Sequence, residues 1–199
     1  MTGRLVAFEG GEASGKSTQA ARLATRLGAV LTREPGGTAV GEHIRELLLD
    51  PAVSNLDPRG EALLMAAARA QHVAEVVRPA LAAGQDVVTD RYAYSSLAYQ
   101  GYGRGLALDE VHWLSDWATQ GLWPDVVLLL DVPDEVAQAR LGLRDRFESE
   151  GGDFHQRVAA GFRALAAEDP KRWAVVDGVG SPDEVEERVW AAVSARLSP

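Results

Sequence analysis

The chain has 199 residues, of which 46% are hydrophobic, and it carries a formal net charge of −9 with no cysteine. This length suits one α/β domain (residues 1–199), and the lack of cysteine excludes disulfides, thiolate metal sites and cysteine nucleophiles. The acidic balance argues against a nucleic-acid partner, because such binding needs a basic face. Since the sequence has no apolar run long enough to cross a bilayer and no secretory leader pattern, we expect no membrane partner and a cytoplasmic location.

Apolar runs and helical patterns alternate along the chain. The runs predict strands at Leu5–Phe8, Ala29–Thr32, Asp86–Thr89, Val126–Asp131 and Ala174–Asp177. Helical spacing fills most of the intervals, at Ser17–Arg26, Ala39–Leu49, Gly60–Leu81, Ser95–Gln100, Leu108–Thr119, Glu135–Leu143, Phe154–Glu168 and Pro182–Leu197. Asp50–Pro58 and Gly101–Leu106 are expected to be surface loops. The alternation predicts a three-layer α/β fold, with a central parallel five-stranded sheet flanked by helices.

Gly10–Ser17 fits the pattern G-x-x-x-x-G-K-[ST] between the first strand and the first helix. In that context the pattern binds nucleoside triphosphates. Gly10 and Gly15 permit backbone angles closed to other residues, so that the N–H groups of the loop converge on an anion. We expect Lys16 to contact the β- and γ-phosphates and Ser17 to offer its hydroxyl to Mg²⁺. The sequence therefore predicts a P-loop nucleoside triphosphate hydrolase-like fold that binds ATP with Mg²⁺.

Two further polar groups follow predicted strands. Asp90 and Arg91 end the third strand, where an acidic residue commonly meets Mg²⁺ and an arginine can fork onto a phosphate. The glycine-rich stretch Thr32–Thr38 ends the second strand. Carboxyl ends of parallel strands meet at one edge of a sheet, so we expect these groups near the phosphate loop. Each alone would also fit a surface ion pair or a plain turn.

The stretch that begins at Ser95 predicts a base-reading face. Ser96 and Gln100 are four residues apart on one helical face, with Tyr99 on the adjacent flank. A glutamine amide offers a donor and an acceptor side by side, which matches the N3–H and the C4 carbonyl of thymine or uracil. A glutamine alone could also turn over and suit cytosine. Arg69 shares a helical face with Met65 and donates only, so near position 4 it would favour a carbonyl over an amine.

Arg144–Asp153 is charged, contains Gly151 and Gly152 and lies between two predicted helices, so we expect a small lid at about 141–153. Arg144 and Arg146 in this segment, with Arg140 just before it, would deliver cations to a transferring phosphoryl group on closure. A solvated helix end paired with acidic neighbours is the alternative interpretation.

In order along the chain, the motifs "FEGGEASGKST", "TREPGGT", "DRYAYSSLAYQGYGRG", "PDVVLLLDV" and "RDRFESEGGDFHQRV" resemble the thymidylate kinase family. The resemblance covers nearly the whole chain, and the ordered set is more specific than the phosphate loop alone. It implies an enzyme that phosphorylates dTMP to dTDP with ATP and Mg²⁺, and a homodimer. It implies an ATP site made by the phosphate loop and one residue near the adenine: Gly10, Gly11, Glu12, Ala13, Ser14, Gly15, Lys16, Ser17, Thr18 and Arg140.

The resemblance also implies roles around the acceptor nucleotide. Arg45 and Arg91 would hold the dTMP phosphate, and Glu12 would lie near the sugar and phosphate. Tyr99 would crowd the 2′ position and favour deoxyribose. The full expected acceptor set is Glu34, Arg45, Met65, Arg69, Arg91, Ser96, Tyr99 and Gln100. The expected catalytic set is Lys16, Arg91, Arg144, Arg146 and Glu12, and the expected metal ligands are Ser17 and Asp90.

Two positions depart from patterns found in parts of the family. One branch has an arginine in the phosphate loop where this chain has Ala13, so here the lid would supply that charge. Several bacterial relatives stack a phenylalanine on the base where this chain has Met65, a residue that packs on aromatic faces with less directional preference.

Two other functions remain open on the sequence. A P-loop kinase acting on a nucleoside hydroxyl would recruit a carboxylate base, for which Glu9, Glu12 and Glu34 are candidates. A nucleotide-dependent switch would turn over ATP slowly without a small acceptor. The tryptophans Trp113, Trp117 and Trp123 are expected in the core, with a dimer face as the alternative. The histidines His43, His72, His112 and His155 have no metal-ligand spacing and are interpreted as packing or surface residues.

Overall fold

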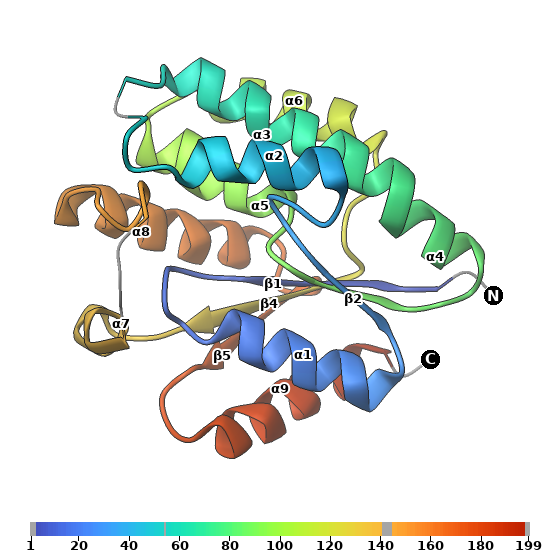
Figure 1. The fold of residues 1–199 in the computed structure, drawn as a ribbon. Coiled ribbons are helices and arrows are strands. Elements are labelled where there is room, and N and C mark those ends of the chain that lie inside the picture. The colour runs from blue at the N-terminus through green and yellow to red at the C-terminus, as the bar shows by residue number, and fades with distance from the viewer. Residues whose placement is uncertain (1–2, 54, 141–144, 198–199) are drawn as a thin grey trace.

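The structure is a computed structural model that describes residues 3–53, 55–140 and 145–197 (Figure 1). In this part of the chain, five parallel strands form one sheet in the order β2-β3-β1-β4-β5. Their bounds are β1 Leu5–Glu9, β2 Val30–Arg33, β3 Val87–Asp90, β4 Val126–Asp131 and β5 Trp173–Asp177. Each lies within one residue of its predicted position, and the predicted fold class is confirmed.

Helices cover both faces of the sheet, which gives three layers (Figure 1). One face carries α1 (Lys16–Leu27) and α9 (Pro182–Leu197). The other layer contains α2 (Ala39–Leu49), α3 (Pro58–His72), α4 (Arg78–Ala82), α5 (Ala93–Ser96), α6 (Leu108–Thr119) and α8 (Gly152–Glu168). The short α7 (Asp134–Arg140) follows β4 at the edge where the strands end. Two π-helical turns, η1 (Val73–Val77) and η2 (Leu97–Gly103), continue α3 and α5.

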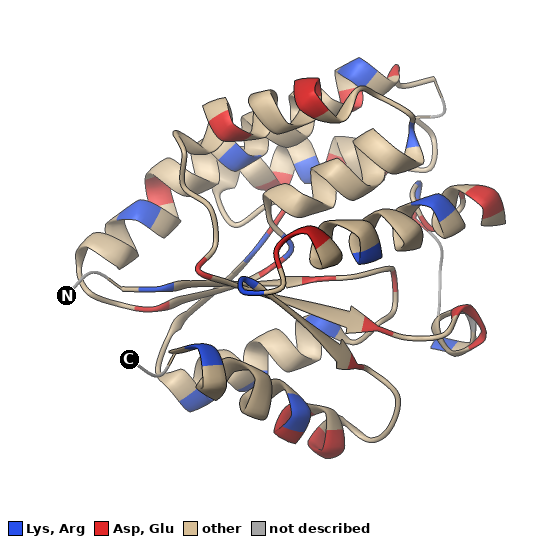
Figure 2. Cartoon of the chain, turned by 180° about the vertical axis from the view of Figure 1, so that it is seen from behind, with Lys and Arg blue, Asp and Glu red and all other residues tan. Residues whose placement is uncertain are grey.

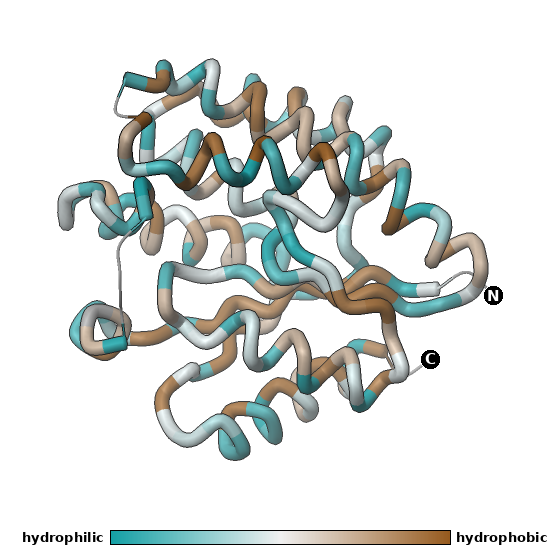
Figure 3. Tube along the Cα trace, in the orientation of Figure 1, coloured by the Kyte–Doolittle hydropathy of each residue, from teal (hydrophilic) through white to brown (hydrophobic). Residues whose placement is uncertain are grey.

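Alternating side chains of the central strands contribute to the hydrophobic core on each face of the sheet. Val6 and Phe8 point toward α1 and α9, whereas Leu5 and Ala7 point to the opposite layer, because successive strand residues face opposite sides. All four side chains are fully buried. In Figure 3 the strands form a hydrophobic centre between more hydrophilic outer helices. A strand buried on both faces explains why the sequence shows continuous apolar runs rather than alternation.

Local signals account for the helix starts near the sheet edge. Thr38 caps α2 by accepting a hydrogen bond from the N–H of Gly41 at 3.0 Å. Asp57 caps α3, and Pro58 occupies the first helical position, where a missing N–H costs nothing. α1 begins directly after Gly15, whose φ of 95° suits glycine. The starts of α1 and α2 each lie beside the end of the strand that precedes them in the chain.

Acidic and basic residues are interspersed along the outer helices in Figure 2, as expected for a chain without a basic face. Among the described residues, no helix is both long and apolar enough to cross a membrane.

Three local predictions are wrong. The expected loop Gly101–Leu106 begins inside η2, with Gly101 and Gly103 buried, because the widened turn packs against α8. The last two residues of the expected lid, Gly152 and Asp153, begin α8. Trp113 and Trp117 are 65% and 68% exposed rather than packed in the core, because α6 buries its opposite face. Trp123 is partly buried against Tyr94, as predicted.

Candidate active site

The phosphate loop is shaped for close approach of an anion. Gly10 has a φ of 140°, and a Cβ there would lie 2.6 Å from the carbonyl oxygen of Leu130, so only glycine fits. The Lys16 Nζ folds over the loop and donates to the carbonyl of Gly11 at 2.5 Å and to Ser14 Oγ at 3.3 Å. Burial, together with Arg91, lowers the pKa of Lys16 to about 8. The lysine therefore rests on neutral groups that an entering phosphate can replace.

Ser17 and Asp90 meet across the edge of the sheet. Ser17 Oγ donates to Asp90 Oδ2 at 2.5 Å, while Asp90 Oδ1 is buried and has no hydrogen-bond partner among the described residues. Hydroxyl and carboxylate oxygens are the ligands that Mg²⁺ prefers. The described residues contain no cluster of three acidic or histidine side chains that could hold a metal alone. This pair fits a magnesium ion whose remaining ligands are phosphate oxygens and water.

Arg91 has a left-handed backbone, with a φ of 68°, in the turn that follows β3. Its guanidinium donates to the carbonyl of Gly10 at 2.9 Å, Ser95 Oγ at 3.2 Å and Glu12 Oε1 at 2.8 Å. The buried Glu9 closes this turn, because its carboxylate accepts from the N–H groups of Tyr92 and Ser95 and from Ser95 Oγ. The turn therefore aims a cation at the phosphate loop with a strained backbone that its neighbours hold.

Glu12 and Tyr99 complete the phosphate end of the site. The Tyr99 hydroxyl donates to Glu12 Oε1 at 2.6 Å and accepts from Arg91 at 3.0 Å. Burial would raise the pKa of Glu12, but the nearby Arg91 and Lys16 outweigh it and lower this pKa to about 2. Burial raises the pKa of Tyr99 well above its usual value. Glu12 is therefore ionised and Tyr99 neutral near pH 7.

Arg69 is held rigidly at the opposite end of the pocket. Its Nε donates to Glu34 Oε2 at 2.7 Å, and both side chains are at most 4% exposed. Its other nitrogens reach Ser96 Oγ at 3.1 Å and the carbonyl of Tyr92 at 3.3 Å. His72 also contacts Glu34, at 2.9 Å. Burial would raise the pKa of Glu34, but Arg69 and His72 outweigh it and lower that pKa.

Gln100 is also buried and bound to a carboxylate. Its amide nitrogen donates to Glu61 Oε1 at 2.8 Å. Gln100 is 1% exposed and Glu61 is fully buried. Two arginines, Arg104 and Arg146, donate to the same carboxylate. This end of the site, where the sequence predicts the base and which is called the base end below, holds a buried network of ion pairs and one amide hydrogen bond.

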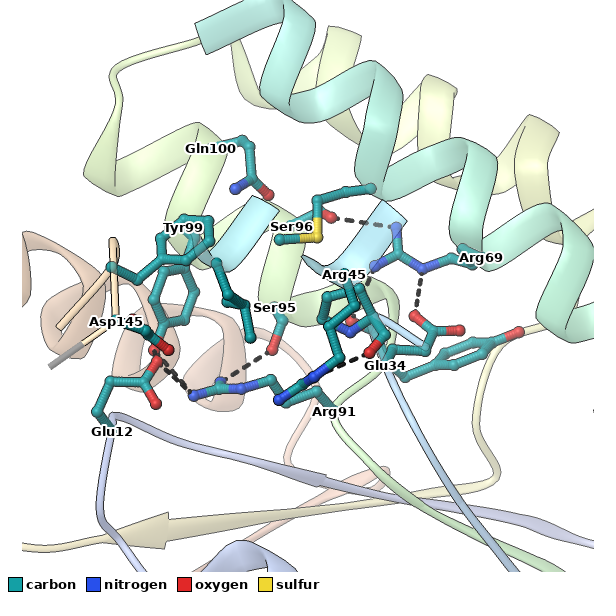
Figure 4. A pocket seen from close by; sticks show the side chains of 15 residues that line it. Glu12, Glu34, Arg45, Arg69, Arg91, Ser95, Ser96, Tyr99, Gln100 and Asp145 are labelled. Atoms are coloured by element: carbon teal, nitrogen blue, oxygen red, sulfur yellow. Dashed lines mark hydrogen bonds and ion pairs between the residues drawn. The ribbon is translucent and has the colours of Figure 1, made fainter. Parts of the chain in front are cut away.

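Two cavities meet at the charged residues. The first is shown in Figure 4 and is called the acceptor pocket below, because the sequence predicts the acceptor there; Arg69, Ser96 and Gln100 lie at one end and Glu12, Ser95 and Arg91 at the other. The second lies beside the phosphate loop and is lined by Lys16, Ser17, Thr18, Asp90 and others. Four side chains line both cavities: Glu12, Glu34, Arg45 and Arg91.

The remaining predicted residues have varied positions. Arg45 donates to the carbonyl of Pro35 at 2.9 Å at the junction of the cavities, and Met65 lines the acceptor pocket. Arg140 donates to the carbonyl of Gly178 at 3.3 Å and lines a recess with Ser14 and Gly15, where an adenine is expected. Arg146 binds Glu61 and the carbonyl of Leu48, away from the phosphate loop. Its expected catalytic role stays a prediction that requires these contacts to break.

Arg144, with the rest of 141–144 in the expected lid, lies outside the described residues. The described part of that segment includes Asp145 and Phe147, which line the acceptor pocket.

The sequence motifs do not reveal two supporting carboxylates, Glu9 and Glu61. The sequence offers Glu9 only as a base for a different reaction, yet Glu9 holds the turn that carries Arg91. Glu61 lies in the first turn of α3, where an acidic residue has a local explanation in the helix dipole. A charged residue at the end of a fully apolar strand was a signal for Glu9. Nothing local marks Glu61 as a partner of Gln100, 39 residues away in sequence.

Comparisons with known proteins agree with this geometry. The family model described as thymidylate kinase matches residues 8–189. The chain is 52% identical to a thymidylate kinase of a Synechococcus species, over 96% of this chain and 95% of that protein. It is 48% identical to the Deinococcus radiodurans thymidylate kinase, over 98% of both. A crystal structure of the Ehrlichia chaffeensis thymidylate kinase superposes with a TM-score of 0.80 at 31% identity, over 97% of this chain and 99% of that one.

The family expected from the ordered motifs is thus confirmed by sequence and by structure, and the alternatives of a nucleoside kinase or a switch protein are not favoured. The chain belongs to the thymidylate kinase family.

Proposed function

We propose that the protein transfers the γ-phosphoryl group of ATP to the 5′-phosphate of dTMP, giving dTDP and ADP. The observation that carries the proposal is the junction of the two cavities, where Arg45 and Arg91 line both the acceptor pocket and the phosphate-loop cleft. Cations at such a junction suit an acceptor that is itself a phosphate. A nucleoside hydroxyl would have no use for them.

The dTMP phosphate is already ionised, so the reaction needs no strong general base. The task of the protein is to bring two anions into line and to neutralise the charge between them. Lys16 would contact the donor phosphates, and Arg91 would hold the acceptor phosphate with Arg45. The neutral carbonyl partners of Lys16 and Arg45 can be exchanged for phosphate oxygens at little cost.

Ser17 and Asp90 would hold Mg²⁺ beside the phosphate loop. When bound, the ion shields the negative charge of the phosphates that the arginines and the lysine do not reach. The unpartnered Asp90 Oδ1 supports this assignment.

At the other end, Arg69, Ser96 and Gln100 would contact the thymine, and Met65 would pack on its face. Tyr99 is 5% exposed and is fixed by Glu12, so its ring would occupy the space beside the 2′ carbon. A rigid ring there disfavours a ribose hydroxyl.

A homodimer belongs to this proposal. Leu63 on α3 and Trp113 and Trp117 on α6 are 59%, 65% and 68% exposed, and an apolar groove runs between the two helices. Exposed large apolar side chains gathered in this way are typical of an interface between subunits. Sedimentation velocity should give a dimer for the natural protein and a monomer for Trp117→Glu. Val179→Glu, a change at a 39%-exposed position in the loop after β5, serves as the matched control and should stay dimeric.

The activity is tested by label transfer from [γ-³²P]ATP with Mg²⁺, with chromatographic identification of the product. We expect labelled dTDP with dTMP and no labelled dTMP when thymidine is the acceptor. Labelled dTMP from thymidine would instead establish a nucleoside kinase and overturn the proposal.

A further inference from the structure

The buried carboxylate of Glu61 has every acceptor position filled. Its Oε1 accepts from Gln100 Nε2 at 2.8 Å and from Arg104 Nε at 3.3 Å. Its Oε2 accepts from Arg104 at 3.0 Å and from Arg146 at 2.8 Å. Glu61 has no exposed surface, so no solvent can replace these donors. Flanked by two guanidinium groups, it is a carboxylate that can only accept hydrogen bonds.

This arrangement fixes which way the Gln100 amide is turned. If the amide flipped, its oxygen would face Glu61 Oε1, and two acceptors would lie in contact in a buried site. Leaving such groups unpaired is costly where water cannot reach them. Gln100 Nε2 therefore stays hydrogen-bonded to Glu61, and the Gln100 amide oxygen faces the pocket.

The Gln100 oxygen accepts no hydrogen bond from any described residue, and Gln100 lines the acceptor pocket. In Figure 4 this oxygen lies on the side of Ser96 and the pocket interior. The pocket thus presents a lone acceptor at this point. Arg69, which can only donate, lies at the same end of the pocket.

We propose that Glu61 is the positioning residue that makes the site select a pyrimidine with an N–H at position 3. The inference rests on the proposed function, because it assumes that the base lies against Gln100. Thymine and uracil carry a donor at N3, whereas cytosine carries an acceptor there and would meet the Gln100 oxygen with like polarity. A glutamine alone would serve both rings by turning over. The buried carboxylate removes that freedom.

The test compares kcat/KM for dTMP and for dCMP in the natural protein and in Glu61→Gln. A glutamine at position 61 can donate as well as accept, so Gln100 regains both orientations. We expect the dTMP/dCMP ratio to fall by roughly 10- to 100-fold, the range of one base-edge contact. The KM for ATP should stay within about threefold, because Glu61 does not line the phosphate-loop cavity. A general loss of structure would alter both the dTMP/dCMP ratio and the KM for ATP.

The Gln100→Ala variant tests whether the effect of Glu61→Gln depends on the Gln100 amide. With Gln100 removed, Glu61→Gln should produce no further change in the dTMP/dCMP ratio, since its effect runs through that amide. Glu150→Gln is the matched control, because it removes the other carboxylate partner of Arg104 and leaves Gln100 untouched. A ratio that is unchanged in Glu61→Gln, or that falls equally in the Gln100→Ala background, would overturn the proposal.

Glu61→Gln leaves two arginines without their buried partner and could fail to fold. In that event Glu61→Asp decides, because it keeps the charge but withdraws the carboxylate by one methylene. We expect the ratio to fall at least threefold there, and an unchanged ratio contradicts the role. A natural protein that phosphorylates dTMP and dCMP equally well would refute this inference alone. A natural protein inactive on dTMP would refute the proposed function.

Discussion

The two ends of the acceptor pocket hold their charged groups in different ways. At the phosphate end, Lys16 and Arg45 donate to backbone carbonyls of Gly11 and Pro35, while Arg91 is paired with the Glu12 carboxylate. At the base end, Arg69 and Gln100 donate to buried carboxylates. A carbonyl is a weak partner that a phosphate can replace, whereas a buried ion pair holds its geometry. The phosphate end therefore delivers charge, and the base end presents a fixed pattern of donors and acceptors.

The largest effect should come from removing the lysine of the phosphate loop. We expect Lys16→Ala to lower kcat by about 1,000-fold or more, since preorganised charge is the main catalytic contribution here. The Kd of dTMP, measured by calorimetry, should change by less than about threefold. Lys171→Ala, at the other lysine of the chain and exposed, is the control and should match the natural protein. Near-normal turnover in Lys16→Ala would refute the assignment of the loop.

Arg91→Ala should separate the two ends most clearly. We expect kcat/KM for dTMP to fall by about 100-fold, because a buried phosphate contact is lost. Binding of thymidine, which has no phosphate, should be nearly unchanged. Gln100→Ala at the base end should instead weaken dTMP and thymidine by the same factor. If Arg91→Ala weakened the interaction with dTMP and with thymidine equally, the two ends of the pocket would not recognise separate parts of the nucleotide.

Glu9 is a second buried carboxylate at the phosphate end, and unlike Glu12 it accepts no hydrogen bond from an arginine of the described residues. Burial raises its pKa from 4.5 to about 7, and hydrogen bonds from Ser95 only partly offset this. Between those two values the folded state keeps a proton that the unfolded state has lost, so stability must fall as pH rises through this window.

We therefore expect the natural protein to lose on the order of 3 kcal/mol relative to Glu9→Gln between pH 4.5 and 7, with little further change above that. Urea unfolding of both proteins from pH 4.5 to 8 measures the difference, from which the common titrations of other groups cancel. Parallel stability curves for the two proteins would contradict the raised pKa.

Tyr99→Phe should have the smallest effect. It removes the hydroxyl that joins Glu12 and Arg91 but keeps the ring beside the expected 2′ position. We expect kcat for dTMP to fall by about two- to tenfold, which corresponds to one hydrogen bond of ordinary net strength, about 0.5–1.5 kcal/mol. Discrimination against the ribonucleotide should persist in a rate comparison with ribothymidine monophosphate. Loss of that discrimination would mean that the hydroxyl, and not the ring, excludes the 2′-OH.

The two ends of the pocket also differ in how far the sequence predicts them. The phosphate end is built from contiguous motifs, so Lys16, Ser17, Asp90 and Arg91 could be assigned from their neighbours. The apolar runs placed each strand within one residue, because both faces of the sheet are buried. The base end depends on partners distant in sequence. Gln100 was predicted as a base reader, but its orientation is set by Glu61 on another helix.

Other long-range features are hidden from the sequence for the same reason. The expected action of Arg146 on the phosphates stays a prediction, and its pairing with Glu61 is a contact that no local pattern reveals. Trp113 and Trp117 share a helical face, as their spacing predicted, but spacing does not say whether that face meets the core or solvent. Long-range pairing and the choice of buried face follow from tertiary packing, which no local pattern contains.

The most direct test of this division between a phosphate end and a base end is ADP release with Mg²⁺-ATP, measured as kcat/KM for a panel of acceptors. The acceptors are dTMP, dUMP, dCMP, UMP and thymidine, and a sample without acceptor gives the background rate. We predict fast turnover with dTMP, measurable turnover with dUMP, and at least about tenfold less with dCMP, the cost of one wrong base contact. Thymidine should give no more ADP than the sample without acceptor. Turnover with thymidine, or ADP release that ignores the acceptor, would contradict the account.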